Sequence, residues 1–173
     1  MAPGARAEQE PRVDTAKVTD RRPLRFETPQ DVRAEVERIV AAERGGALRR
    51  SGNWTAGQAL GHLATWINLG YEGLPAHVRP PWFIKLLLRF KKASYLRDGL
   101  PAGVRLPKVE GGTLGVEPLP LDEGRERLLA AWKRLEAAPP DRPNVVFGPL
   151  THAEWIALNL RHAELHLGFL HPG

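Results

Sequence analysis

Apolar residues recur at intervals of three and four positions in four stretches of the chain, and this spacing predicts four amphipathic α-helices. The predicted helices cover residues 28–44, 55–70, 122–138 and 151–170. Gly45-Gly46 ends the first of them, Asp122 is the expected N-cap of the third, and Pro139-Pro140 ends the third. A chain with these elements belongs to the all-α class.

A long crossover, residues 71–121, connects the second and third predicted helices. Prolines interrupt it repeatedly, and it contains one short amphipathic piece, residues 82–96. Four helices with one long connection describe a four-helix bundle, in which metal sites are built by side chains of facing helices. We therefore expect any functional site to combine residues from different helices.

The composition indicates a globular protein, with 173 residues, 42% of them hydrophobic. We expect one helical domain, residues 23–173, preceded by a polar, disordered tail, residues 1–22. No stretch reaches the ~20 apolar residues of a membrane span. Arg21-Arg22 is followed by Pro23 and Arg25 rather than by an apolar run, so we expect no export signal and a cytoplasmic protein.

The chain contains no cysteine, which excludes disulfides, thiolate metal ligands and cysteine nucleophiles together. Any metal ion must therefore be held by histidine and oxygen ligands.

His162 and His166 lie one turn apart on the last predicted helix, on its apolar side and beside Trp155 and Asn159. Two inward imidazoles need polar partners, because a buried polar group without one is costly. A divalent metal is one such partner, and hydrogen bonds to backbone or water are the other. His62, at the edge of the apolar stripe of the second helix, leaves the same two alternatives open.

Two segments resemble a known family. Asn53-Trp54-Thr55-Ala56-Gly57-Gln58-Ala59-Leu60-Gly61-His62-Leu63-Ala64 is similar to the start of helix two in the DinB-like superfamily, and residues 147–170 are similar to its last helix. Together with Gly73-Leu74-Pro75 and residues 100–104, they resemble the uncharacterised DUF1569 branch. The resemblance extends from Arg22 to the C-terminus.

The resemblance implies a DinB-like four-helix bundle with one metal-ligand histidine from helix two and two from helix four. On this chain those positions are His62, His162 and His166. A site with three histidines keeps a coordination position open, and imidazole ligands suit zinc, nickel or iron. Relatives in the superfamily include thiol-dependent transferases, so we expect a small-thiol transferase or a hydrolase. Trp66, Trp155 and Asn159 are the expected pocket neighbours.

The basic stretch at residues 79–97 supports a competing hypothesis, a non-catalytic protein that docks on anionic membrane or nucleic acid. Its basic residues are interleaved with apolar ones, and the chain has a formal charge of +5. We prefer the interpretation in which this segment packs its apolar side on the bundle and solvates its charges. We accordingly expect a small-molecule substrate, such as a low-molecular-weight thiol, and no stable membrane or nucleic-acid partner. A homodimer remains open.

Overall fold

The computed structural model describes residues 12–75, 78, 81–106 and 109–173. Its helices are α1 Pro29–Arg44, α2 Ala56–Glu72, α3 Trp82–Asp98, α4 Leu121–Ala137 and α5 His152–Leu167, with a short 3₁₀ turn, η2 Glu110–Gly112. Two short strands, β1 Arg49–Arg50 and β2 Leu170–His171, form a small antiparallel sheet. The predicted all-α class is confirmed. None of the described helices is long and apolar enough to cross a membrane.

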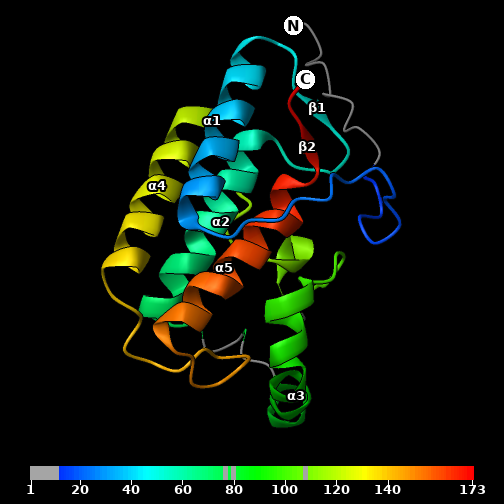
Figure 1. Cartoon of the computed structure of the whole chain (residues 1–173). Helices are drawn as coiled ribbons and strands as arrows, with labels where there is room; N and C mark the ends of the chain where they lie inside the picture. Colours follow the sequence, from blue (N-terminus) through cyan, green and yellow to red (C-terminus); the bar gives the residue numbers. More distant parts are fainter. Residues whose placement is uncertain (1–11, 76–77, 79–80, 107–108) are drawn as a thin grey trace, which may run out of the picture.

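The four predicted helices correspond to α1, α2, α4 and α5, which lie side by side around a shared core (Figure 1). All four contribute fully buried side chains, among them Val36 of α1, Leu60 of α2, Trp132 of α4 and Leu167 of α5. The apolar stripes that predicted the helices are thus the surfaces by which they pack.

Three of the helices begin with the same local device. Thr28, Thr55 and Thr151 each accept a hydrogen bond from the backbone three residues later, and the side chain at that later position bonds back. The predicted cap of α4 is wrong, because α4 begins at Leu121 after Pro120 and has no side-chain cap. Asp122 lies instead in the first helical turn, where a carboxylate interacts favourably with the helix dipole.

The last helix is shorter than predicted. It ends at Leu167 with Gly168 as its C-cap, and the chain then pairs as β2 with β1 in the register Arg49–His171. Strands of two residues are too short to show an alternating pattern, so this sheet could not be predicted from the sequence. Arg22 hydrogen-bonds to the carbonyls of Leu167 and Leu170 beside it.

The expected tail, residues 1–22, lies partly outside the described residues, which begin at residue 12. In its described part, Val13 exchanges two backbone hydrogen bonds with the Asn53 side chain, and Arg22 pairs with the buried Glu35.

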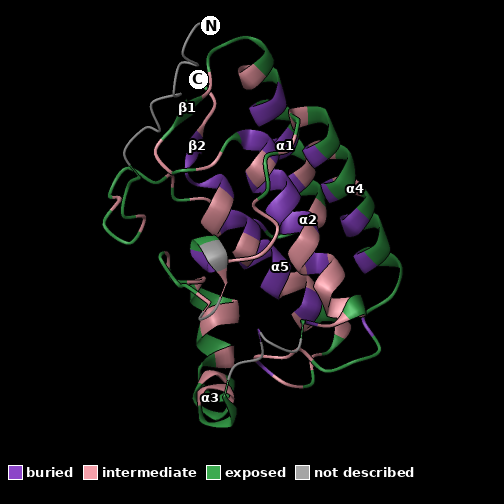
Figure 2. Ribbon diagram, turned by 180° about the vertical axis from the view of Figure 1, so that it is seen from behind, coloured by how far each residue is buried: buried purple, intermediate pink, exposed green. Residues whose placement is uncertain are grey.

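The amphipathic piece predicted in the crossover forms α3, but its expected packing is wrong. α3 has no buried residue (Figure 2). Its large apolar side chains Trp82, Phe83, Leu86, Leu87 and Phe90 are exposed rather than packed on the other helices. Arg79 of the predicted basic stretch lies outside the described residues.

The segment before α4 lies directly on α2, and this is possible because α2 has glycines there. A β-carbon at Gly57 would come within 2.1 Å of the Leu119 carbonyl oxygen, and one at Gly124 within 2.6 Å of the Gly57 carbonyl oxygen. At Gly61 the obstructing atom is the end of the flexible Leu119 side chain.

Gly57→Ala should therefore destabilise the fold by about 1–3 kcal/mol, because the backbone of Leu119 must move to admit the methyl group. Gly61→Ala is the matched control, and it should cost less, since the Leu119 side chain can rotate and alanine favours the helix. Urea denaturation of both variants measures the difference. Equal losses of unfolding free energy in the two variants would contradict this account of the contact.

Candidate metal centre

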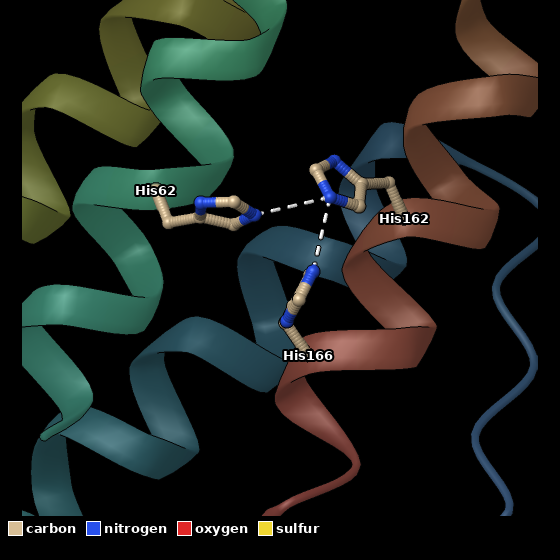
Figure 3. A group of neighbouring side chains, drawn as sticks. All are labelled: His62, His162 and His166. Carbon is tan, nitrogen blue, oxygen red and sulfur yellow. Dashed lines mark hydrogen bonds between the residues drawn. The ribbon is translucent and has the colours of Figure 1, made fainter. Parts of the chain in front are cut away.

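The structure brings together the three histidines that the sequence singled out. His62 projects from α2, and His162 and His166 project from adjacent turns of α5 toward it (Figure 3). The Nε2 atom of His162 lies 3.3 Å from Nε2 of His62 and 3.0 Å from Nε2 of His166. One nitrogen of each ring lies within 4.8 Å of the others. The predicted convergence is confirmed.

A backbone carbonyl fixes the tautomer of His62. Its Nδ1 lies 2.7 Å from the Leu114 carbonyl oxygen, which can only accept, so Nδ1 carries the proton and donates it. The lone pair of this neutral ring is therefore at Nε2, directed to the other two histidines. Metal-ligating histidines are commonly oriented by such a bond from the other ring nitrogen.

Hydrogen bonds alone do not satisfy the three facing nitrogens. Because His62 Nε2 offers a lone pair, a proton on His162 Nε2 can be donated to one neighbour and not to both. A cation accepts a lone pair from all three. Tetrahedral bonds of about 2.0–2.1 Å also place ligand nitrogens about 3.3 Å apart, close to the two separations found here. All three nitrogens lie within 4.8 Å of one another, so the residues could hold a metal ion.

Burial keeps the three rings in the neutral form that a metal requires. It lowers the pKa of His62 to about 4, against a smaller opposing effect of the bond to the Leu114 carbonyl. Burial also lowers the pKa values of His162 and His166 well below the usual range, and the nearby imidazoles lower them further. At neutral pH all three lone pairs are available.

Two tryptophans lie against the cluster. The ring of Trp54 stacks on His166 at a centroid distance of 4.9 Å and lies 4.7 Å from His62. Trp66 lies 6.1 Å from His62 and 5.9 Å from His162, and its buried indole N–H has no hydrogen-bond partner among the described residues. Trp66 was an expected neighbour, whereas sequence reasoning missed Trp54, although it lies in the motif beside the N-cap of α2.

The other two expected neighbours, Trp155 and Asn159, lie nearer the start of α5 than the histidines do. The ring of Trp155 packs on Gly70, two turns beyond His62 on α2. Asn159 is buried and donates from Nδ2 to the carbonyl of Trp155 within its own helix. Their role as pocket residues stays a prediction.

The crossover also helps to position His62, and this role could not be predicted from the sequence. Its segment at residues 114–120 runs along α2, where Gln58 Nε2 donates to the Val116 carbonyl at 2.9 Å. Gly115 approaches Thr65 so closely that a β-carbon would lie 2.6 Å from that side chain. These contacts hold the Leu114 carbonyl against His62.

The fold and the site together define a predominantly helical protein with a cluster of three histidines, one buried and two half-buried, that could hold a metal ion. A family model described as "Protein of unknown function (DUF1569)" matches residues 18–173, and the chain belongs to this family. The resemblance to DUF1569 is thus confirmed. No curated protein and no solved structure matches the chain in the comparisons made.

The metal-free chain should lose stability in mild acid. His62 has its ordinary pKa of 6.5 when unfolded and a pKa of about 4 when folded, so the unfolded state binds more protons between these values. The contribution of His62 to the free energy of unfolding is therefore fully present above pH 6.5 and is lost as the pH falls toward 4. The contribution of His62 is a loss of about 2 kcal/mol from pH 7 to pH 5.

Urea denaturation in the presence of a chelator at both pH values measures this loss. In His62→Asn, which can still donate a hydrogen bond to Leu114, the loss between pH 7 and pH 5 should be smaller. An unchanged dependence on pH in that variant would contradict the assignment.

Proposed function

We propose that the chain is a DinB-like four-helix-bundle protein in which His62, His162 and His166 bind one divalent metal ion, and that it transfers a small thiol. The convergence of the three Nε2 atoms, 3.0 and 3.3 Å apart in two of their pairs, carries the proposal. The metal is zinc, nickel or iron, since imidazole nitrogen suits each of them.

The donor set favours an anionic ligand from solution. In the part of the chain that the structure describes, the group suited to a metal consists of three neutral imidazoles. The full positive charge of a divalent ion would thus remain to attract an anion. Because the chain has no cysteine, a sulfur ligand would have to come from a small molecule.

The surroundings of the cluster favour thiol transfer over hydrolysis. Glu164, the acid nearest to the histidines in sequence, accepts hydrogen bonds from Phe26 N and Arg161, so it is not free to act as a base on water. A bound metal would leave a coordination position open and deprotonate a coordinating thiol without a separate base. Trp54 and Trp66 lie against the histidines and would cover part of the surroundings of this position.

Small thiols are kept reduced in the cytoplasm, and we place the activity there. The residues of the chain would orient this thiol rather than react with it. His62, held by the Leu114 carbonyl, fixes one ligand direction, and the stacked Trp54 fixes the plane of the His166 ring.

Elemental analysis of the purified protein should find about one divalent metal ion per chain. His62→Asn and His166→Ala should each lose it, because each variant removes one of three ligands. His152→Asn is the matched control on α5. Its Nε2 contacts the Leu135 carbonyl at 2.6 Å, about three turns from His162, so this variant should keep the metal. Metal retention by both ligand variants would disprove the site.

A spectrum of the cobalt-loaded protein tests the thiol assignment. Adding glutathione or mercaptoethanol should produce a sulfur-to-cobalt charge-transfer band, and His166→Ala should not show it. The same thiols should support turnover of electrophilic model substrates. A cobalt protein whose spectrum responds to none of the thiols would contradict thiol transfer while leaving metal binding intact.

A further inference from the structure

One face of α3 carries a continuous apolar stripe that the rest of the described chain leaves uncovered. Trp82 is 76% exposed and Phe90 80% exposed, and Phe83, Leu86 and Leu87 are exposed with them. Successive helical residues are rotated by about 100°, so these five side chains fall within a sector of about 140°. Five large apolar side chains together on one exposed face are unusual for a monomeric soluble protein.

Basic residues border this stripe on both sides. At the same rotation, Arg89 lies beside Trp82 at one edge and Lys91 lies beside Leu87 at the other, each within about 40°. Both are exposed. The Arg89 guanidinium also lies close to Gly148, where a β-carbon would come within 2.7 Å of it. Within α3 the first acidic residue is Asp98, its last position, so the half of the helix that carries the stripe is purely basic.

The opposite face of α3 packs on the rest of the protein. Half-buried Ile84 and Leu88 lie on it, Lys92 pairs with Glu154 of α5 at 2.6 Å, and the Tyr95 ring lies 6.0 Å from Phe147. The helix is thereby held on α5, and its free end extends beyond the other helices (Figure 1). The stripe therefore faces outward.

We infer that α3 docks in the plane of an anionic lipid surface. Tryptophan, phenylalanine and leucine on one side, with lysine and arginine along its edges, are the pattern of an interfacial helix. The apolar side chains enter the boundary between headgroups and acyl chains, while the edge cations reach lipid phosphates. The formal charge of +5 adds attraction to an anionic leaflet.

The charges of α3 favour an anionic lipid surface over a second copy of the chain or a nucleic acid as its partner. Two copies of the stripe placed face to face would bring Arg89 and Lys91 of each copy close to those of the other, and like charges repel. Nucleic acid would attract the cations, and the aromatic rings of the stripe could stack on bases, but Leu86 and Leu87 in the same stripe offer neither hydrogen bonds nor rings. An anionic lipid surface matches both the apolar stripe and its basic edges.

Sedimentation with vesicles tests the inference on the full chain. The protein should bind vesicles of phosphatidylcholine with one third phosphatidylserine and bind pure phosphatidylcholine much more weakly. Fluorescence of Trp82, the most exposed of the tryptophans, should shift to the blue on binding. Leu87→Ser with Phe90→Ser should weaken binding at least about tenfold, because both side chains enter the lipid.

Arg89→Glu with Lys91→Glu should also weaken binding at least about tenfold. Arg50→Glu with Lys133→Glu is the matched control, since it changes the net charge equally at exposed positions outside α3. Val13→Ser with Val104→Ser is the control for lost exposed apolar groups. Both control variants should bind nearly as the parent does. All variants should keep the parent's melting temperature, because the changed side chains are exposed. If the variant with Leu87→Ser and Phe90→Ser does not, Trp82→Ser replaces it.

Several outcomes would overturn the inference. One is equal binding to neutral and anionic vesicles, and another is binding that the Leu87 and Phe90 changes leave intact. A dimer that the same two changes dissociate, without vesicle binding, would assign the stripe to a second copy. Binding of duplex DNA but not of vesicles would assign it to nucleic acid.

Discussion

Both the helix packing and the candidate metal centre depend on the close approach of the 114–120 segment to α2. The Leu119 carbonyl occupies the space that a β-carbon of Gly57 would need. Five residues earlier in the same segment, the Leu114 carbonyl accepts the Nδ1 proton of His62 and so directs its Nε2 lone pair toward α5. A side chain at position 57 would push away the segment that leads into α4 and disturb the carbonyl that orients the histidine. Stability and ligand geometry are therefore coupled through one backbone contact.

The rotation of α5 about its axis is set by a second contact on its other side. Glu164 accepts a hydrogen bond from Phe26 N at 2.6 Å, and Arg161 donates to the Phe26 carbonyl. These two side chains are buried and also pair with each other, so α5 cannot turn without leaving charged groups unsatisfied. His162 and His166 are interleaved with them in sequence and point the other way, toward α2. The buried pair thus orients the histidines as well as anchoring the N-terminal segment.

The sequence predicted the helices because threonine caps and apolar stripes are local signals. The convergence of His62 with His162 and His166 followed from helical spacing together with the resemblance to a family. The bond from His62 to Leu114 could not be predicted, because any residue can present a backbone carbonyl and the crossover has no periodic pattern. Trp54 was missed for a related reason, since a residue just before the N-cap lies outside the helical repeat and its direction does not follow from that repeat.

The orientation of α3 could not be read from its sequence, because apolar residues occur on both of its sides. Leu86 and Phe90 define one stripe and Ile84 and Leu88 a second, and either could have faced the bundle. Contacts distant in sequence accompany this orientation, among them the ion pair between Lys92 and Glu154 and the contact between Tyr95 and Phe147. The helical repeat places Arg89 and Lys91 beside the stripe of Leu86 and Phe90, and because the second stripe packs on α5, that stripe and its basic edges are exposed together. A helix that buried its main stripe would have turned those cations to water, so the amphiphilic surface is a consequence of the fold and not of the helix alone.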